Sequence, residues 1–276
     1  MLDIVACIKQ VPDTTQVRID PETNTLVREG VPAIINPFDL HAIEAAVQIK
    51  ERYGGTVSLL AMGPPQAVEA LQKGLSFGAD RAVLLTDRAL VGSVTLATSA
   101  ALAAGIRTLA KDQPVDLVIC GKQTIDGDTA QVGPGIATRL GFTQLTYVGR
   151  VESLDLERRR IVVRRILEGA EEVLEAPLPA LLTVLKEIGE PRYASLPSVI
   201  RGLRTPVPTW GAKDIGVAAS EVGLAGSPTQ VRRIFAPPQR TGGEVFTADG
   251  DADRVANEVL DRLLATGMLV GGSEDR

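Results

Sequence analysis

The run Leu2-Asp3-Ile4-Val5-Ala6-Cys7-Ile8 (residues 2–8) decides how the fold is interpreted, because six of its seven side chains are apolar. A run without polar alternation is typical of a parallel strand that is covered by helices on both faces. Similar short runs recur at residues 56–61, 82–85 and 117–120. We therefore predict four parallel strands in the first half of the chain.

Helical spacing fills the intervals between these strands. After Asn36-Pro37-Phe38-Asp39, apolar residues recur every three or four positions, up to the glycine stop Tyr53-Gly54-Gly55. Further helices are predicted from Pro64-Pro65 towards Gly74, over residues 95–111 and over residues 129–140. Strands that alternate with helices predict an α/β fold with a doubly wound, mostly parallel, Rossmann-like sheet.

Two segments depart from this alternation. Residues 17–20 and 25–27 flank a Pro-Glu-Thr-Asn turn and predict a hairpin at the edge of the sheet. Residues 148–156, 160–167 and 172–174 predict an antiparallel extension, and residues 180–185 predict a strand that returns to the core.

The chain after Gly189 is rich in proline and glycine and shows little periodicity until residues 249–264, which have helical spacing. Such a segment cannot build its own core, so it is either a disordered tail or an arm that becomes ordered on a partner. The helix near its end favours the arm. We predict a nucleotide-binding α/β domain over residues 1–188, and an extended arm with a C-terminal helix over residues 189–276.

Composition excludes several classes of protein. The 276 residues include 3% aromatics and carry a net charge of −5, which disfavours nucleic acid as a partner. Cys7 and Cys120 lie in apolar runs and predict buried thiols of a reducing compartment. The sequence shows no signal-peptide pattern and no apolar run long enough for a transmembrane segment, so we expect a cytoplasmic protein.

The loops that follow the strands are the candidate ligand site, because open parallel sheets bind ligands at the carboxyl ends of their strands. The loop from Gly121 to Gly135 combines four glycines with hydroxyl and amide side chains, and we expect a helix to start near Asp128 or Thr129. This composition predicts an anion cradle. Asp126 and Asp128 either cap that helix or bind a ribose hydroxyl or a divalent cation.

The loop after residues 82–85 offers a second hydroxyl-rich helix start, where Thr95 and Thr98 share one face and either bind a phosphate or cap the helix. Several enzyme signatures are missing: the sequence has no GxGxxG after the first strand and no GxxxxGK[ST]. His41 is the single histidine, which leaves a Ser-His-Asp triad poorly supported and excludes a multi-histidine metal site. We expect His41 to pack against neighbouring residues, and a hydrolytic enzyme is the weakest interpretation.

Several ordered motifs resemble the beta subunits of electron transfer flavoproteins, the family that includes the FixA proteins. They are Lys9-Gln10-Val11-Pro12-Asp13, Asn36-Pro37-Phe38-Asp39, Met62-Gly63-Pro64, Gly78-Ala79-Asp80-Arg81, the loop from Gly121 to Gly135, and Glu190-Pro191-Arg192-Tyr193-Ala194-Ser195-Leu196-Pro197. The resemblance implies an adenine-nucleotide-binding fold and a heterodimer with an alpha subunit that holds FAD. It also implies an electron carrier rather than a stand-alone enzyme.

By this resemblance, the nucleotide site maps onto the loops already selected. In the family the site holds either AMP, as a structural ligand, or a second FAD that takes hydride from NADH in electron bifurcation, and the residues after strands three and four look like the bifurcating group. The implied cofactor-binding residues are Cys7, Asn36, Pro37, Phe38, Asp39, Met62, Asp87, Thr95, Thr98, Thr124, Ile125, Asp126, Gly127, Asp128, Thr129, Ala130, Gln131, Val132, Gly133, Pro134 and Gly135.

The resemblance also implies partners. Residues 193–200 are similar to the family's recognition loop, in which Leu196, with Tyr193 and Pro197 beside it, would contact a flavoprotein dehydrogenase of the acyl-CoA type or another type. A quinone-reducing partner and ferredoxin or flavodoxin are further candidates. From another class of protein, a nucleotide-binding module similar to universal stress proteins remains as an alternative, although such a module would not need the arm.

Overall fold

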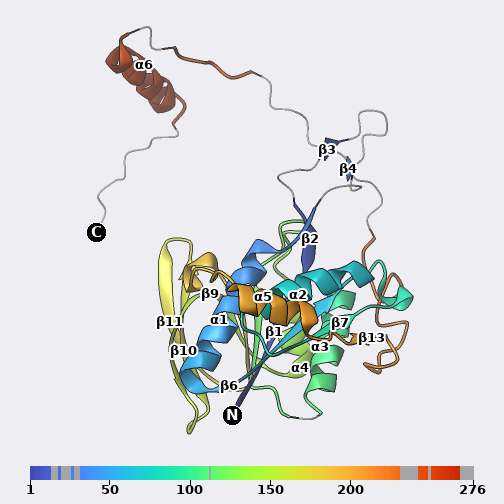
Figure 1. Ribbon diagram of the computed structural model, residues 1–276. Helices are drawn as coiled ribbons and strands as arrows, with labels where there is room; N and C mark the ends of the chain where they lie inside the picture. The colour runs from blue at the N-terminus through green and yellow to red at the C-terminus, as the bar shows by residue number, and fades with distance from the viewer. Residues whose placement is uncertain are drawn as a thin grey trace. The chain divides into compact units, whose positions relative to one another are not determined.

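The first strand, β1 (Leu2–Ile8), lies near the middle of the main sheet, and all seven of its residues are buried. The computed structural model describes residues 1–13, 18–19, 26–27, 32–111, 113–230, 242–247 and 250–267. The chain forms two units, Met1–Ile234 and Phe235–Arg276. The sheet belongs to the first unit (Figure 1).

The main sheet has nine strands in the order β11-β10-β9-β12-β8-β1-β6-β7-β13. All neighbours from β9 to β13 in this order are parallel, whereas β9, β10 and β11 form an antiparallel extension. This confirms the predicted mostly parallel, Rossmann-like α/β fold. The strands other than β1 are β6 (Gly55–Met62), β7 (Arg81–Leu85), β8 (Leu117–Gly121), β9 (Thr143–Asp155), β10 (Arg160–Leu167), β11 (Ala170–Pro177), β12 (Ala180–Val184) and β13 (Thr209–Trp210).

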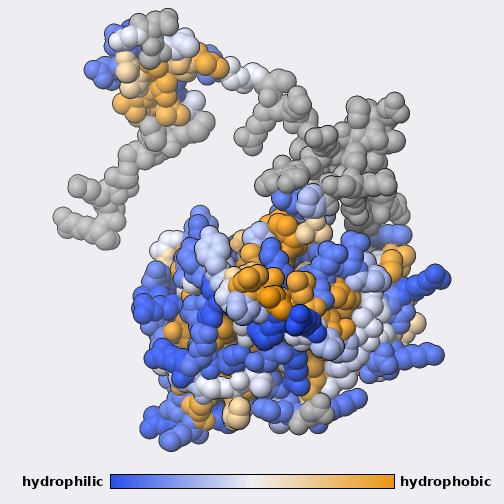
Figure 2. Space-filling model, viewed as in Figure 1, coloured by the Kyte–Doolittle hydropathy of each residue, from blue (hydrophilic) through white to orange (hydrophobic). Residues whose placement is uncertain are grey.

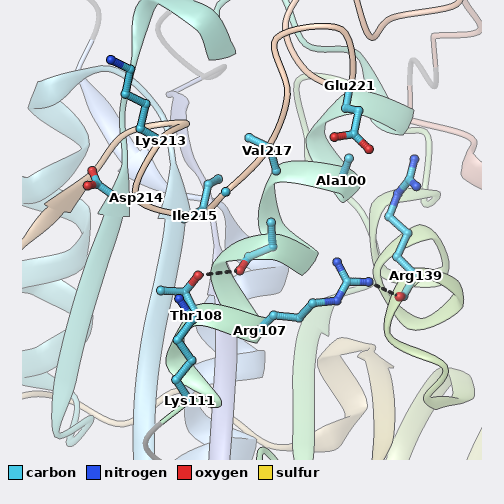
Figure 3. Close-up of a pocket in the computed structure, with 12 residues that line it drawn as sticks. Ala100, Arg107, Thr108, Lys111, Arg139, Lys213, Asp214, Ile215, Val217 and Glu221 are labelled. Atoms are coloured by element: carbon cyan, nitrogen blue, oxygen red, sulfur yellow. Dashed lines mark hydrogen bonds between the residues drawn. The ribbon is translucent and has the colours of Figure 1, made fainter.

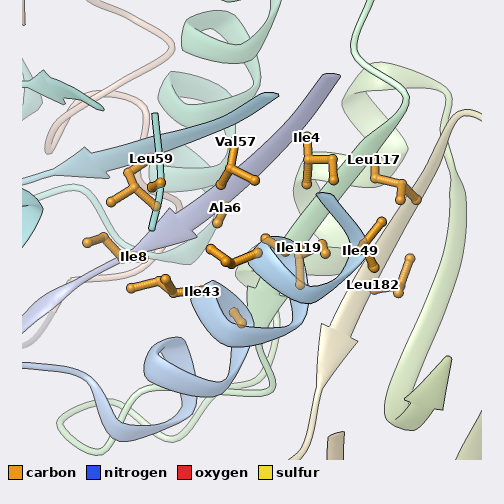
Figure 4. Close-up of a cluster of buried hydrophobic side chains, with 14 of the residues drawn as sticks. Ile4, Ala6, Ile8, Ile43, Ile49, Val57, Leu59, Leu117, Ile119 and Leu182 are labelled. Carbon is orange, nitrogen blue, oxygen red and sulfur yellow. The ribbon is translucent and has the colours of Figure 1, made fainter. Parts of the chain in front are cut away.

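Helices cover both faces of the parallel strands, and alternate residues of β1 point into two separate cores. Ile4, Ala6 and Ile8 pack with Ile43 of α1 in one core (Figure 4), while Val5 and Cys7 belong to the other. The first core is covered by α1 (Pro37–Tyr53) and by η2 (Pro65–Ala67) with α2 (Val68–Ser76), and the second by α3 (Thr95–Leu109) and α4 (Val132–Leu140). A short helix, η3 (Arg88–Leu90), precedes α3.

Two local predictions were wrong. The fourth helix begins at Val132 rather than near Asp128 or Thr129, because Asp128 and Ala130 have φ values of 51° and 54°, outside the range of a right-handed helix. The early hairpin is confirmed for β3 (Arg18–Ile19) and β4 (Leu26–Val27), but these strands form a two-stranded sheet of their own instead of joining the edge of the main sheet. The rest of the predicted hairpin, including its turn, lies outside the described residues.

A second small sheet pairs β2 (Gln10–Pro12) with β5 (Ala33–Ile35) in antiparallel fashion. Because neither two-stranded sheet joins the main sheet, the edge strands of the main sheet are β11 and β13.

The segment after η4 (Lys186–Ile188) returns to the α/β unit. Within it, α5 (Leu196–Arg204) lies on α2, where the Arg201 guanidinium donates to the carbonyl oxygens of Leu75 and Ala79 at 2.8 and 3.1 Å. β13 then adds to the free side of β7. The first unit consequently extends to Ile234, beyond the boundary expected near residue 188. That residues 189–276 wrap a partner subunit stays a prediction.

The second unit contains α6 (Ala252–Ala265), close to the helix predicted over residues 249–264. The Asp251 carboxylate caps it by accepting the backbone N–H of Arg254 at 3.0 Å. Leu260 and Leu264 are exposed on this helix. Of the helices in the described parts of the chain, none has the length and apolar character needed to cross a membrane.

Candidate functional site

A crevice is expected between the carboxyl ends of β1 and β8, because the chain turns to opposite faces of the sheet after these two neighbouring strands. β1 leads to α1 on one face, and β8 leads to α4 on the other. Such a topological switch point is where open α/β sheets bind ligands. The structure therefore brings the predicted loop Gly121–Gly135 next to the end of β1 and the start of α1.

Asn36 and Asp39 join the two sides of this crevice. The Asn36 side-chain amide donates to the carbonyl oxygen of Gln123 at 2.9 Å and accepts the N–H of Ile125 at 3.1 Å. Asp39, which is 4% exposed, accepts the N–H of Lys9 at 2.8 Å. Burial raises the pKa of Asp39 to about 7, against the opposing effect of its hydrogen bonds. These two predicted residues thus hold the backbone after β1 and the backbone after β8 in fixed positions.

Lys9 forms the rim of the crevice together with Asp126. Its ammonium group contacts both carboxylate oxygens of Asp126, at 2.6 and 2.8 Å. Partial burial opposes ionisation of Asp126, but the Lys9 ammonium and the Thr124 hydroxyl hold its pKa below the usual value. Sequence reasoning did not select Lys9 as a site residue. The available signal was its position directly after the first strand, where a basic side chain faces the ligand edge.

The loop from Thr124 to Gln131 is open to solvent. Its residues 126–129 and 131 are exposed, and its turn is stabilised by the Asp128 N–H donating to the Thr124 carbonyl at 2.9 Å. The Gln131 side chain accepts the Thr95 hydroxyl at 3.2 Å, so this loop meets the start of α3. The predicted residues of both loops therefore lie together at the point where α3 and α4 begin.

Other predicted residues have structural partners that account for them. Gly133 and Gly135 allow close packing of α4, because a Cβ there would lie 2.5 Å from Thr183 and 2.8 Å from Ser99. The Asp87 carboxylate accepts the N–H groups of Ala89 and Ala212, which lower its pKa. By contrast, the single hydrogen bond of the Thr98 hydroxyl among the described residues is a long one, of 3.4 Å to the Ser93 carbonyl. A cofactor role for these residues stays a prediction.

The two thiols lie side by side on β1 and β8, where Cys7 and Cys120 are register partners. Both are free and buried, and their mutual hydrogen bond and burial raise the pKa of the Cys120 thiol. The predicted buried thiols are thus confirmed. His41 packs as expected, since its Nδ1 donates to the Gly189 carbonyl at 2.8 Å. Among the described residues, no group of three or more histidines, cysteines or carboxylates is placed to hold a metal ion.

The predicted contact residues Tyr193, Leu196 and Pro197 lie at the surface, outside the crevice. Tyr193 is 100% exposed and Leu196 is 73% exposed, and Figure 2 shows apolar surface around α5 and α2. Ser195 caps α5, and Leu196 is the first residue of that helix. Arg192 precedes these residues and forms bidentate salt bridges with Glu44 and Glu51 of α1, at N–O distances of 2.6 to 3.0 Å.

Comparison with known proteins identifies the family. Residues 23–215 match the family described as "Electron transfer flavoprotein domain". The chain is 53% identical over 238 residues to protein FixA of Bradyrhizobium diazoefficiens, covering 86% of this chain and 83% of that protein. It is 48% identical to subunit CarD of the caffeyl-CoA reductase-Etf complex of Acetobacterium woodii (94% and 97% covered), and 44% identical to the electron transfer flavoprotein subunit beta of Megasphaera elsdenii (96% and 98% covered). The chain belongs to the electron transfer flavoprotein family, among the FixA proteins and beta subunits.

Proposed function

We propose that this chain is the beta subunit of a heterodimer that oxidises NADH by flavin-based electron bifurcation in the cytoplasm. In this proposal the crevice between β1 and β8 holds a FAD, and the alpha subunit holds another. Electrons then leave singly, one towards the alpha-subunit FAD and one towards a low-potential acceptor such as ferredoxin or flavodoxin. The similarity to CarD, which is named as part of a reductase-Etf complex, favours this over an AMP-binding structural subunit.

The observation that carries the proposal is the meeting of two helix N-termini at the crevice. The first N–H groups of α3 and α4 have no intrahelical acceptor, as in every helix. Val94, the N-cap of α3, has no polar side chain, and the side chain of Gln131, the N-cap of α4, bonds Thr95 instead of its own helix. Adjacent N–H groups of two helices suit the two phosphates of a dinucleotide better than the single phosphate of AMP.

The residues of this chain would bind and orient the cofactor. Lys9 supplies a positive charge at the rim, while Asn36 and Asp39 keep the loop after β8 in place. When bound, FAD supplies the redox chemistry, because a flavin accepts two electrons from NADH and releases them one at a time. The exposed residues 126–129 and 131 would border the part of FAD that extends beyond the adenosine.

Partner contact would take place at a separate surface formed by Tyr193, Leu196 and Pro197. The Arg192 contacts with Glu44 and Glu51 hold this surface against α1, so its side chains are presented with little loss of conformational freedom on binding. An exposed leucine at the start of a fixed helix is a suitable anchor for an apolar pocket on a flavoprotein dehydrogenase or quinone-reducing partner.

The test is to co-express the chain with its alpha subunit, extract the cofactors, count FAD and AMP for each heterodimer, and add NADH without oxygen. We expect two FAD molecules and bleaching of the flavin absorbance. One FAD with one AMP and no response to NADH would reject the proposal. In a Lys9→Met variant the FAD count should fall towards one, whereas Lys73→Met, which changes an exposed lysine in the last turn of α2, should retain both.

A further inference from the structure

A cavity of about 550 Å³ lies outside the crevice, between α3, α4 and the segment that follows β13 (Figure 3). Arg107 reaches it from the last turn of α3, Lys111 from just after that helix, Arg139 from the end of α4, and Lys213 from the segment. Because α3 starts at the crevice and leads away from it to the amino end of β8, the cavity is separate from the proposed cofactor site.

The charges around this cavity are unbalanced. Four cationic side chains and two carboxylates, Asp214 and Glu221, line it, which leaves a local charge of about +2 in a chain of net charge −5. Both carboxylates already accept backbone N–H groups, Asp214 from Gly211 at 2.7 Å and Glu221 from Ala218 at 3.1 Å.

The four cations also lack the partners that are common elsewhere in this chain. Over the described stretches of sequence, none of the four forms an ion pair with a carboxylate. By contrast, Arg164 on β10 pairs with both Glu152 and Glu171. The backbone N–H of Ala89 and, more weakly, Lys213 lower the pKa of Asp87, but no described carboxylate lies within ion-pair distance of the four cations. Cations gathered in this way around one hollow are the arrangement expected of an anion site.

The two arginines are held in place without using all of their donors. Arg139 donates to the Ser99 hydroxyl at 3.3 Å and to the Leu96 carbonyl at 3.2 Å, and Arg107 donates to the Arg139 carbonyl. Each guanidinium has five N–H groups, so several remain for a ligand. Figure 3 shows Arg107, Arg139 and Glu221 on one side of the cavity and Lys213 with Asp214 on the other. The hydrogen bond from Arg107 to a carbonyl in the last turn of α4 gives Arg107 a structural role. Within the described residues, neither lysine side chain has such a role.

Apolar side chains complete the lining: Ala100 and Ala104 of α3, with Ile215 and Val217 from the segment opposite. We propose that this cavity binds a small organic dianion, in which a phosphate monoester or a pair of carboxylates is carried on a short apolar body. Two negative charges match the local excess of two positive charges. The volume is within the range of small-molecule sites, which is roughly 300–1,000 Å³.

The test is isothermal titration calorimetry on the full chain with its partner subunit, at low salt. Phenyl phosphate and glutarate are the two dianionic probes, and phenol is the neutral control. We expect one dianion to bind in a 1:1 ratio, and phenol not to bind. Lys111→Glu and Lys213→Glu should each weaken the binding about tenfold, because each replaces an attractive charge by a repulsive one. Neither lysine side chain makes a hydrogen bond within the described residues, so both variants should fold.

Two control variants locate the binding. Lys186→Glu makes the same change of charge away from the cavity and should leave the affinity unchanged, as should Lys9→Glu at the crevice. Binding that is lost in the Lys9 variant but kept in the Lys213 variant would place the probe in the crevice and overturn the proposal. Failure of both dianions to bind would overturn it as well. Preference for phenyl phosphate or for glutarate distinguishes the two ligand chemistries.

Discussion

Replacement of Asp39 by asparagine should stabilise the chain above neutral pH, although it removes a charged hydrogen-bonding group. Burial raises the pKa of Asp39 from 3.8 to about 7 in the folded chain. The folded state therefore binds a proton that the unfolded state has already released, so stability falls as the pH rises from about 4 to about 7. At about 1.4 kcal/mol for each pKa unit, the difference amounts to about 4 kcal/mol above pH 7. Asparagine resembles the protonated carboxyl group and does not incur this loss.

Urea unfolding of the purified chain, followed by circular dichroism at pH 4 and pH 8, measures this effect. The Asp39→Asn variant should match the unsubstituted chain at pH 4 and exceed it by a few kcal/mol at pH 8. Asp39→Ala is the control: it leaves the N–H groups of Lys9 and Gly121 without their acceptor, should cost about 2–5 kcal/mol at pH 4, and should lose the same pH dependence as Asp39→Asn. An asparagine variant no more stable than the unsubstituted chain at pH 8 would refute the reasoning.

Three further substitutions test other parts of the structure. Leu196→Ala should raise the dissociation constant for the dehydrogenase about 10- to 100-fold, because burial of a leucine contributes about 1.5–3 kcal/mol, while the flavin content stays constant. Arg192→Lys should raise the same constant about tenfold and speed hydrogen exchange over residues 193–200, because an ammonium group cannot hold both glutamates in two-pronged contacts. Gly121→Ala should destabilise the chain by about 2–4 kcal/mol and lower its nucleotide content, since the new Cβ would lie 2.4 Å from Asp39 and 2.7 Å from the backbone of Phe38.

Matched control variants separate these effects from a nonspecific loss of folding or stability. Val173→Ala removes an exposed apolar side chain from β11 and should leave dehydrogenase binding unchanged. Gly243→Ala adds a Cβ that has no atom of the described residues within 4 Å, and it should be nearly neutral. Unaltered dehydrogenase affinity in both the Leu196 and Arg192 variants would remove the basis for this docking surface. Full stability and full nucleotide content in Gly121→Ala would contradict the close approach of α1 to β8.

The hydrophobic pattern of the sequence predicted correctly those elements whose position depends mainly on burial of apolar side chains. The predicted runs at residues 2–8, 56–61, 82–85 and 117–120 match β1, β6, β7 and β8 to within about one residue, because strands buried on both faces need continuous apolar sequence. The start of α4 was misplaced by about three residues. Asp128 and Ala130 adopt left-handed backbone conformations there, and no periodic pattern marks such a conformation at alanine.

Two elements after residue 188, α5 and β13, were not predicted, because they depend on an already formed surface, whereas α6 was predicted from its helical spacing. β13 has two residues and exists by pairing with β7, while α5 is held by bonds from Arg201 to carbonyl oxygens at the end of α2. β13 is too short to show a pattern, and α5 has helical spacing at Leu196, Val199, Ile200 and Leu203, but nine residues are too few to form a stable helix without a surface to pack on. Proline and glycine in this region correctly indicated a segment without its own core, but they could not indicate where that segment would pack.

The same limit applies to the candidate site, as the loop before α3 shows. The family resemblance implied Asp87 as a cofactor residue, yet its carboxylate accepts the N–H of Ala212, which is 125 residues further along the chain. Ser93 likewise accepts the N–H of Gly223, and Ser227 accepts the N–H of Val94 at the very start of α3. Spacing along the sequence could place polar residues at the ligand edge of the sheet, but it could not reveal which of them are already used by a distant segment. The free N–H groups at the start of α3 are therefore positioned by residues 212–227, which makes that segment a structural part of the proposed cofactor site.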